Sequence, residues 1–373
     1  MSKVLVPLLI VSAAAAIYAA SVRNGMKDFE VYRTAAGRAL RAENLYRPED
    51  AHYQYKYLPA FAFAMAPLAL VDDAAARLGW YAVSFGLLCL FILAAVQSVP
   101  DKRLTDRVLM WAAILFVGKY YGRELYLGQT NVLLGIVLLG ALLAAEAGAS
   151  RTAGALVAVG VFIKPYALIL LPWLWFAAGP SSLATSAAVL AGGICLPALA
   201  FGWNGNVHEI LEWYRTVTTT TEPNLLKEEN ISFATAWAKW IGPGPLASVL
   251  AGATGTASLA AAGFVIARRR LVNHPAYLEF GFLMLIVPLL SPQGWDYLLL
   301  LATPAILCIV DRWQDTSPGW KAVTGAAIAV ASFTIFDLLR RPLYASLMAM
   351  SVVTIAVTAL MMCLVNLRRR RLA

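Results

Sequence analysis

An acidic residue lies directly behind the first apolar segment of the chain. Tyr32 follows Asp28 by four residues, so on a helix the two side chains share one face. Carboxylates at the edge of the hydrocarbon are costly and usually mark a functional site. A single carboxylate in a membrane-facing cleft suits a general base that takes a proton from a hydroxyl. The structural alternative is that Asp28 caps a helix or pairs with Lys27 or Arg23.

A second unusual charge interrupts a later apolar run at Lys164, which Pro165 follows. Proline lets a helix break, so the pair predicts a hairpin with the lysine at its apex. A lysine at such a place is costly unless it meets water or an anion. Phosphate is the natural partner, because lysine offers a compact charge and three donors. The alternative is a lysine at the end of a span that reaches toward the interface.

Other polar residues begin or separate apolar runs. Gln129 and Asn131 stand at the start of one run, where their amides suit either sugar hydroxyls or helix capping. Trp295 and Asp296 suit stacking and hydrogen bonding on a sugar ring, although interface tryptophans are also common without a ligand. For the pair 123–124 we expect structural ion pairing instead.

The composition places these residues in a membrane protein. The chain is 60% hydrophobic and 14% charged, whereas soluble domains are nearer a quarter charged. The apolar runs lack the alternating pattern of an outer-membrane barrel. We therefore expect an all-α, polytopic integral membrane protein with about 12 transmembrane helices in one domain over residues 1–373. The predicted spans are 4–21, 76–97, 107–118, 130–145, 153–163, 166–178, 183–200, 245–267, 275–290, 297–310, 322–336 and 343–366.

Several alternatives are weaker. The four cysteines all fall inside predicted spans and the three histidines are scattered, so neither disulfides nor a metal site is expected. The net charge of +9 lies largely beside the spans, which favours membrane orientation over a nucleic-acid partner. Residues 4–21 are similar to a signal peptide, but Asp28 and many further spans follow, which favours an uncleaved first span.

Arginine runs set the expected topology. Residues 268–270 and 368–371 should be cytoplasmic together with Lys3, which places both termini inside the bacterial plasma membrane. If both termini lie on the same side, the number of membrane crossings must be even. Segment 58–70, which is short and bracketed by prolines, must then be a re-entrant or interfacial helix and not a crossing. Residues 22–75 become the first extracytoplasmic loop. That loop carries seven basic residues, among them Lys56, which runs against the positive-inside rule for an outer loop but suits an anionic lipid headgroup.

With this topology the polar clusters converge on one face. The extracytoplasmic side receives residues 28–57, 119–124, 128–131, 164–165, 230–232 and 291–296. Residues 201–244 should lie over the site, with a short amphipathic helix at 209–216 and a flexible threonine-rich segment after it. No Walker motif, dinucleotide fingerprint or Asp-x-Asp is present, which disfavours a nucleotide-dependent reaction on the inner face.

The ordered motifs resemble glycosyltransferase family 87, a GT-C fold family of enzymes that use polyprenyl-phosphate-linked sugars. The resemblance covers nearly the whole chain and rests on Asp28 with Tyr32, Asn44-Leu45-Tyr46, Tyr57-Leu58-Pro59, Gly128-Gln129-x-Asn131, Ile163-Lys164-Pro165, Asn230-x-Ser232 and Ser291-Pro292 with Trp295. It implies a GT-C-type bundle, an extracytoplasmic site, a polyprenyl monophosphate mannose donor and no metal. Members often place a histidine after the tryptophan, where this chain has Asp296.

We therefore expect a plasma-membrane glycosyltransferase that uses no cofactor. It would transfer a hexose, with mannose favoured, to a hydroxyl of a lipid-linked or cell-envelope glycan, and the anomeric configuration would invert. Membrane lipids would surround the enzyme. The resemblance makes Asp28 the catalytic base. The expected substrate-binding residues are Tyr32, Lys56, Tyr57, Gln129, Asn131, Lys164, Asn230, Ser232, Trp295 and Asp296. The rival is a transporter or flippase for a lipid-linked sugar, which would tend to show internal repeats that this sequence lacks. A non-catalytic glycolipid-binding subunit is a third possibility.

Overall fold

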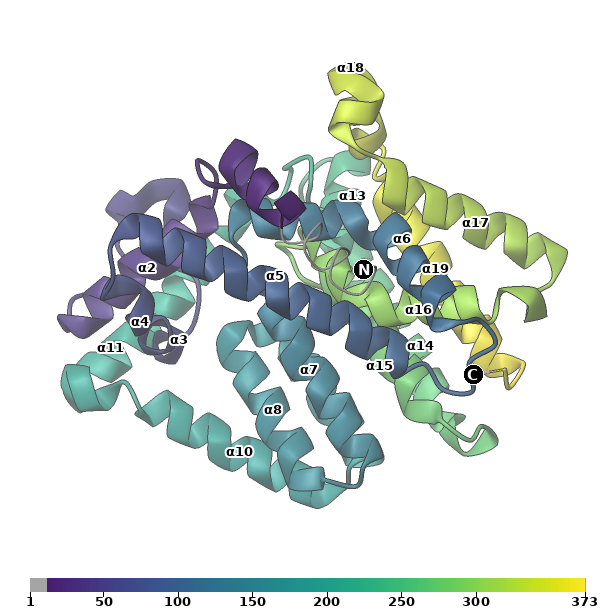
Figure 1. Ribbon diagram of the computed structural model, residues 1–373, viewed down its shortest axis with the longest axis horizontal. Helices are drawn as coiled ribbons and strands as arrows, with labels where there is room; N and C mark the ends of the chain where they lie inside the picture. Colours follow the sequence, from purple (N-terminus) through teal and green to yellow (C-terminus); the bar gives the residue numbers. More distant parts are fainter. Residues whose placement is uncertain (1–11, 373) are drawn as a thin grey trace.

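The computed structural model describes residues 12–372, and this part of the chain is helical without strands (Figure 1). The predicted span 4–21 therefore lies mostly outside the described residues. Two short 3₁₀ elements, η3 (Pro165–Ile169) and η5 (Asp296–Ala302), separate longer helices near the site. The α-helices are α2 (Lys27–Leu40), α3 (Pro59–Ala64), α4 (Ala66–Ala69), α5 (Asp73–Gln97), α6 (Asp106–Leu127), α7 (Asn131–Glu146), α8 (Ser150–Ile163), α9 (Leu170–Ala177), α10 (Pro180–Cys195), α11 (Ala198–Thr219), α12 (Thr221–Asn224), α13 (Phe233–Ile241), α14 (Pro245–Ala267), α15 (Pro275–Leu290), α16 (Thr303–Asp311), α17 (Pro318–Phe333), α18 (Phe336–Ala349) and α19 (Val352–Arg369).

The all-helical membrane architecture is confirmed. In the described part, α5, α14 and α19 are each long and apolar enough to cross a membrane. Two bent pairs, α10 with α11–α12 and α17 with α18, raise this number to 5 if each pair is one span. Further apolar helices are shorter, at 10–17 residues. The expected number of about 12 spans stays a prediction.

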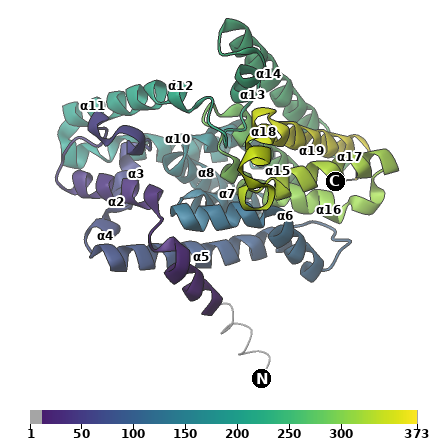
Figure 2. The same cartoon turned by 90° about the horizontal axis from the view of Figure 1, so that it is seen from above.

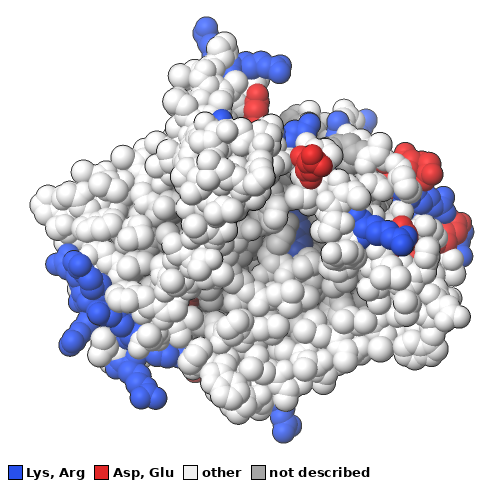
Figure 3. Space-filling model, turned by 180° about the vertical axis from the view of Figure 1, so that it is seen from behind, with Lys and Arg blue, Asp and Glu red and all other residues white. Residues whose placement is uncertain are grey.

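Most of the charged side chains on the face in Figure 3 gather at two ends of the molecule. A cluster of Lys and Arg marks one end and mixed charges mark the other; a few more stand on the protrusion at the top and at the bottom edge, and the surface between is largely uncharged. Figures 1 and 2 place α2, α3 and α11 at one end and the C-terminus at the opposite end. An uncharged band with charges at its ends is what a bilayer requires of a spanning protein.

Helix α15 runs through the middle of the packed core, and nearly all of its residues are buried. It packs against α14, α16 and α19. At one end Glu279 of α15 is fully buried and bonded to two neighbours: it accepts from Arg368 Nη1 of α19 at 3.2 Å and from Trp173 Nε1 of α9 at 3.0 Å. A buried carboxylate is tolerated only when it is paired in this way. These bonds tie three helices together at the end away from α2.

Several helix boundaries correct the predicted spans. The span predicted at 107–118 continues to Leu127 in α6, because the helix ends only where Gly128 adopts a left-handed conformation (φ 67°). The span predicted at 343–366 is divided: α18 ends at Ala349 and α19 begins after Ser351, whose φ is 55°. Helix α18 is bent by 106° from α17, so the chain turns at the end of the predicted span 322–336, and within the predicted span 343–366 only α19 has the length of a crossing.

The region over the site also differs from expectation. The predicted short helix at 209–216 is part of α11, which is longer and bends by 92° from α10. The threonine-rich segment, predicted to be flexible, is helical. Its hydroxyls bond backbone carbonyls one turn earlier: Thr219 to Arg215, Thr220 to Thr216 and Thr221 to Val217, at 2.7–2.8 Å. Threonine satisfies its hydroxyl within a helix by this bond, which sequence composition alone does not reveal.

Candidate active site

A cavity of about 660 Å³ lies at the α2 end of the molecule. Its wall comes from α2, the end of α6, the break after α8, α11 and the segments 227–229 and 291–297. The break after α8 occurs where the sequence predicted it. Lys164 is extended (φ −151°, ψ 130°) between Ile163 and the 3₁₀ turn that begins at Pro165. The chain therefore delivers a buried lysine to the cavity from the end of a helix.

The side chain of Gln129 connects the two charges that the sequence singled out. Its Nε2 donates to Asp28 Oδ2 at 2.8 Å, and its Oε1 accepts from Lys164 Nζ at 3.1 Å. The same amide donates to the Tyr297 hydroxyl at 3.2 Å and accepts from the Tyr32 hydroxyl at 3.0 Å. An amide has two donor hydrogens and two acceptor lone pairs, and all four are used here. Gln129 is thus held in one orientation.

Asp28 reaches this amide from the first turn of α2. Helix α2 begins after Met26, a residue in the left-handed region (φ 53°) whose N–H donates to Tyr126 O at 2.8 Å. That bond joins the start of α2 to the end of α6, which is where Gln129 follows Gly128. Asp28 is partly buried and lines the cavity. Its position at the cavity wall allows its carboxylate to meet a ligand.

Tyrosine rings surround Lys164. Its Nζ lies 5.6, 5.9 and 6.0 Å from the ring centroids of Tyr57, Tyr166 and Tyr297. Ring faces attract a cation at this range. Lys164 lies between the predicted spans 153–163 and 166–178, and burial lowers its pKa to about 8, opposed by the nearby charges of Glu124 and Asp28. The ammonium group is therefore held by weak attractions and gains from an anionic ligand.

The other tyrosines add neutral donors. The hydroxyls of Tyr32 and Tyr57 are hydrogen-bonded at 2.8 Å, and their rings meet edge to face. Burial raises the pKa of both hydroxyls well above the usual value. Both therefore stay protonated. Trp295 and Tyr297 stack with centroids 6.4 Å apart, and both line the cavity.

Positive charge dominates the cavity wall. Five basic side chains line it against two acidic ones, and the set is Lys27, Lys56, Arg123, Lys164 and Lys227 with Asp28 and Glu229. Burial lowers the pKa of Lys56, and the charge of Asp28 opposes that effect. Concentrated charge of one sign in a cleft attracts ligands of the opposite sign. The wall suits an anionic ligand.

Four expected substrate-binding residues do not line the cavity. Asn131 is fully buried and donates to Glu124 Oε2 at 2.7 Å. Asn230 donates to Pro292 O at 2.8 Å, and Ser232 caps α13. Asp296 is buried, and its backbone N–H donates to Glu229 O at 2.9 Å. These residues hold the wall from behind, and the remaining expected residues, Tyr32, Lys56, Tyr57, Gln129, Lys164 and Trp295, line the cavity with Asp28.

Other cavity residues were not among the expected ones. Tyr166 and Tyr297 each stand within two residues of a motif that the sequence singled out, so proximity to those motifs was an available signal. Trp213 of α11 also lines the cavity, and its Nε1 donates to Lys56 O at 3.1 Å. Arg123, expected only to pair structurally, lines the cavity and also pairs with Glu229 at 3.2 Å.

Comparison with known proteins gives one match. The family model of glycosyltransferase family 87 matches residues 55–292, which is more than half of the chain. The chain belongs to glycosyltransferase family 87. No curated protein and no solved structure matches it. As a family 87 protein with several apolar helices, it is a membrane glycosyltransferase, and it therefore uses a sugar donor and a glycan acceptor.

The family 87 match includes some of the site and leaves some outside. Gln129 and Lys164 lie within the matched range, whereas Asp28 lies before it and Trp295 and Tyr297 lie after it. The structure brings both groups to one cavity. Among residues 12–372 no group of three His, Cys, Asp or Glu side chains is placed to hold a metal ion.

Proposed function

We propose that this family 87 glycosyltransferase transfers a hexose from a polyprenyl-phosphate-linked donor to a hydroxyl of a lipid-linked or cell-envelope glycan. Mannose is the favoured hexose. The observation that carries the proposal is the Asp28–Gln129–Lys164 chain of hydrogen bonds in a basic cavity. It sets a carboxylate and a cation on opposite sides of one rigid amide. A proton acceptor and an anion site are the two groups that this reaction needs.

Asp28 acts as the general base. Its carboxylate takes the proton of the acceptor hydroxyl as that oxygen attacks the anomeric carbon of the donor. The bond from that carbon to the phosphate oxygen breaks on the opposite side, so the configuration inverts. The leaving group is already an activated phosphate, so the reaction proceeds without a nucleotide or an essential metal. The remaining acidic residue of the wall, Glu229, is paired with Arg123.

Lys164 receives the donor phosphate. Its ammonium group has three donor hydrogens, and a phosphate oxygen is a stronger acceptor than the amide of Gln129. Negative charge grows on the phosphate as the glycosidic bond breaks, and a fixed cation stabilises that charge. Lys56 lines the same cavity and adds positive charge beside it. The stacked rings of Trp295 and Tyr297 offer a flat surface for a sugar ring.

Gln129 is a positioning residue in this scheme. Because its four hydrogen-bonding positions are filled by protein groups, it is less suited to the sugar contact that the sequence suggested. It holds Asp28 away from Lys164 by the length of one amide. Without it the two opposite charges would be drawn together, and a carboxylate in direct contact with a cation is a weaker base.

The cavity end faces the extracytoplasmic side in this proposal, with both termini in the cytoplasm. Support comes from the arginine-rich segments 268–270 and 368–371, which the positive-inside rule assigns to the cytoplasm. The segments 22–75 and 201–244 then form the extracytoplasmic loops around the site.

Reconstituted protein tests the proposal. Vesicles containing the purified protein receive a glycan acceptor with either polyprenyl-phosphate mannose or a nucleotide-linked mannose. We expect mannosyl transfer from the polyprenyl donor alone, with inverted anomeric configuration and without loss in EDTA. Movement of the donor across the vesicle membrane with no transfer would support the flippase alternative instead. Loss of transfer in EDTA that divalent ions restore would contradict the metal-free mechanism.

A further inference from the structure

Helix α11 carries an exposed apolar face that no other part of the described chain covers. After the bend at Gly202 (φ 70°), Trp203, Val207, Leu211 and Tyr214 are each more than half exposed. Their spacing of four, four and three residues puts them on one side of the helix. We call these four residues the α11 stripe.

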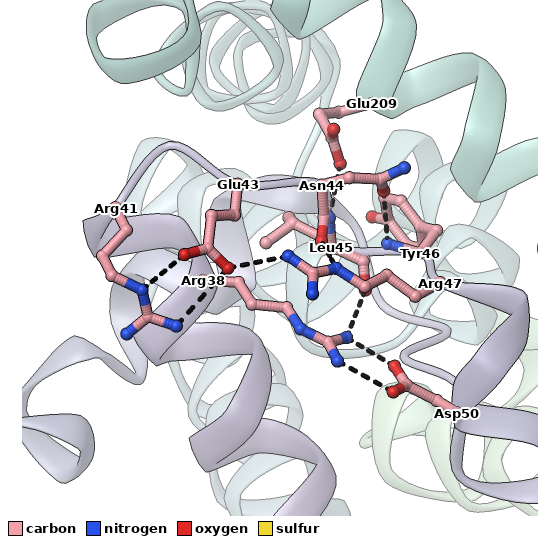
Figure 4. A network of polar contacts seen from close by, with 9 residues as sticks. All are labelled: Arg38, Arg41, Glu43, Asn44, Leu45, Tyr46, Arg47, Asp50 and Glu209. Atoms are coloured by element: carbon pink, nitrogen blue, oxygen red, sulfur yellow. Dashed lines mark hydrogen bonds and ion pairs between the residues drawn. The ribbon is translucent and has the colours of Figure 1, made fainter.

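The side of α11 next to the protein is fixed by polar bonds. Glu209 accepts from the Leu45 N–H at 3.0 Å, and Asn206 donates to Ile194 O at 2.9 Å. Trp213, on the same side, lines the cavity. Figure 4 shows Glu209 descending from its helix onto the loop that carries Leu45.

That loop is itself held by charge pairs. Arg38 donates to both carboxylate oxygens of Asp50 and to Leu45 O, and Glu43 accepts from Arg41 and Arg47 (Figure 4). The loop under α11 is therefore bonded to α2 through Arg38. Since one side of α11 is attached to it, the direction of the stripe is determined.

A third side of α11 is polar. His208 and Arg215 are exposed and lie next to the stripe, on the side away from Glu209. The helix thus has one side bonded to protein, one apolar and one polar. This three-sided pattern is the one that a helix needs when it rests at a boundary between protein, lipid and water.

We propose that the α11 stripe is inserted into the outer lipid leaflet, so that α11 lies in the membrane interface as part of the cavity wall. Three observations indicate that lipid covers the α11 stripe. Helix α11 is bent by 92° from α10, an apolar helix in a predicted span, so it runs along the membrane plane. Exposed apolar residues also stand at the end of α10 next to α11, at Ile194, whose carbonyl accepts from Asn206, and at Leu196.

The third observation is the composition of the stripe. It contains one tryptophan and one tyrosine, which favour the headgroup level of a bilayer, and no charged residue. A consequence follows for the site. Because Trp213 of the same helix lines the cavity and bonds Lys56 O, insertion of the stripe fixes one wall of the cavity against the lipid. Lipid-linked ligands then reach the cavity beside α11.

Two adjacent residues provide a matched test. In full-length protein with the four native cysteines replaced by alanine, Val207→Cys and His208→Cys each carry a nitroxide label. The protein is reconstituted in vesicles of phosphatidylcholine and phosphatidylglycerol. We expect oxygen to relax the Val207 label more strongly than a water-soluble nickel chelate does, and the reverse for His208. Access of the chelate to both labels, or of neither reagent to the Val207 label, would overturn the proposal.

A second measurement keeps the test valid if the cysteine-free protein folds poorly. In the otherwise native chain, Val207→Cys and His208→Cys are treated in isolated membranes with a membrane-impermeant maleimide. A thiol in lipid neither ionises nor meets the reagent, so we expect labelling of His208→Cys to be at least about tenfold faster. Equal rates would show that the stripe faces water. Both readouts are independent of transfer activity and of the proposed donor.

Discussion

Asp28 and Lys164 are hydrogen-bonded to opposite ends of the same side chain. The Gln129 amide donates to Asp28 Oδ2 at 2.8 Å and its carbonyl oxygen accepts from Lys164 Nζ at 3.1 Å. The two charges come from α2 and from the break after α8, and the side chain of Gln129, two residues after the end of α6, connects them. The predictions below separate the contributions of these three side chains.

The Asp28→Asn variant tests the general base. Asparagine keeps the size of the side chain and an oxygen for the Gln129 amide, but it does not take up a proton. We expect turnover to fall by about 10²–10⁴-fold, the usual contribution of a positioned base. The measurement is the maximal rate of transfer, with thermal unfolding as the control for folding. Near wild-type turnover would refute the assignment.

The Gln129→Glu variant tests the positioning role. A second carboxylate would face Asp28, and like charges raise the pKa values at which such a pair titrates. We expect a slower maximal rate and an acid limb of the pH–rate profile that moves to higher pH. Gln293→Glu is the matched control, because Gln293 lines the cavity but its amide contacts Thr220 and Thr221 instead. An equal shift of the acid limb in both variants would argue against a positioning role for Gln129 between Asp28 and Lys164.

Lys164→Ala should weaken use of the donor and lower the maximal rate, because the leaving phosphate loses its cation. Lys164→Arg should restore part of both losses, since arginine keeps the charge in a different shape. The Michaelis constants for donor and acceptor are measured separately. If Lys164→Ala raised only the acceptor constant, Lys164 would belong to the acceptor side of the site.

The pH dependence of donor use follows from the lowered pKa of Lys164. Burial brings it to about 8, so in the empty site the ammonium loses its proton as the pH rises through about 8. We expect kcat/KM for the donor to be constant between the acid limb set by the general base and this pH, and to fall above it. Arginine stays charged throughout, so the alkaline limb should disappear in Lys164→Arg. If the alkaline limb persisted in Lys164→Arg, the group that titrates near this pH would not be Lys164.

The topology is tested by cysteine labelling in intact cells. Arg41→Cys and Lys227→Cys, at exposed positions of the two proposed extracytoplasmic loops, should react with an impermeant thiol reagent. Arg369→Cys, at the exposed end of α19, should react only after lysis. Reaction of the C-terminal cysteine in intact cells would show that the orientation is the reverse of the proposed one and that the cavity does not face the extracytoplasmic side.

The sequence was sufficient where local chemistry decides. Apolar runs without alternation predict helices whatever their neighbours are, and Pro165 breaks a helix through its own ring and its missing N–H. The family resemblance came from ordered motifs and was confirmed over residues 55–292. Asp28 and Tyr32 share one face of α2 as their spacing indicated, and both bond Gln129.

Tertiary structure decided which polar residues reach the cavity. Gln129 and Asn131 are two residues apart and looked equivalent in the sequence, yet Gln129 meets Asp28 while Asn131 turns to Glu124. The difference arises because α7 begins at Asn131, and the N–H groups of its buried first turn donate to the Glu124 carboxylate, as the Val132 N–H does to Glu124 Oε1 at 2.8 Å. The bends after α10 and α17 likewise set the directions of α11, which lies in the predicted loop 201–244, and of α18, which takes the first part of the predicted span 343–366. Local pattern gives the type of a helix, but the direction of its side chains depends on partners that are distant in the chain, such as Tyr297 for Gln129.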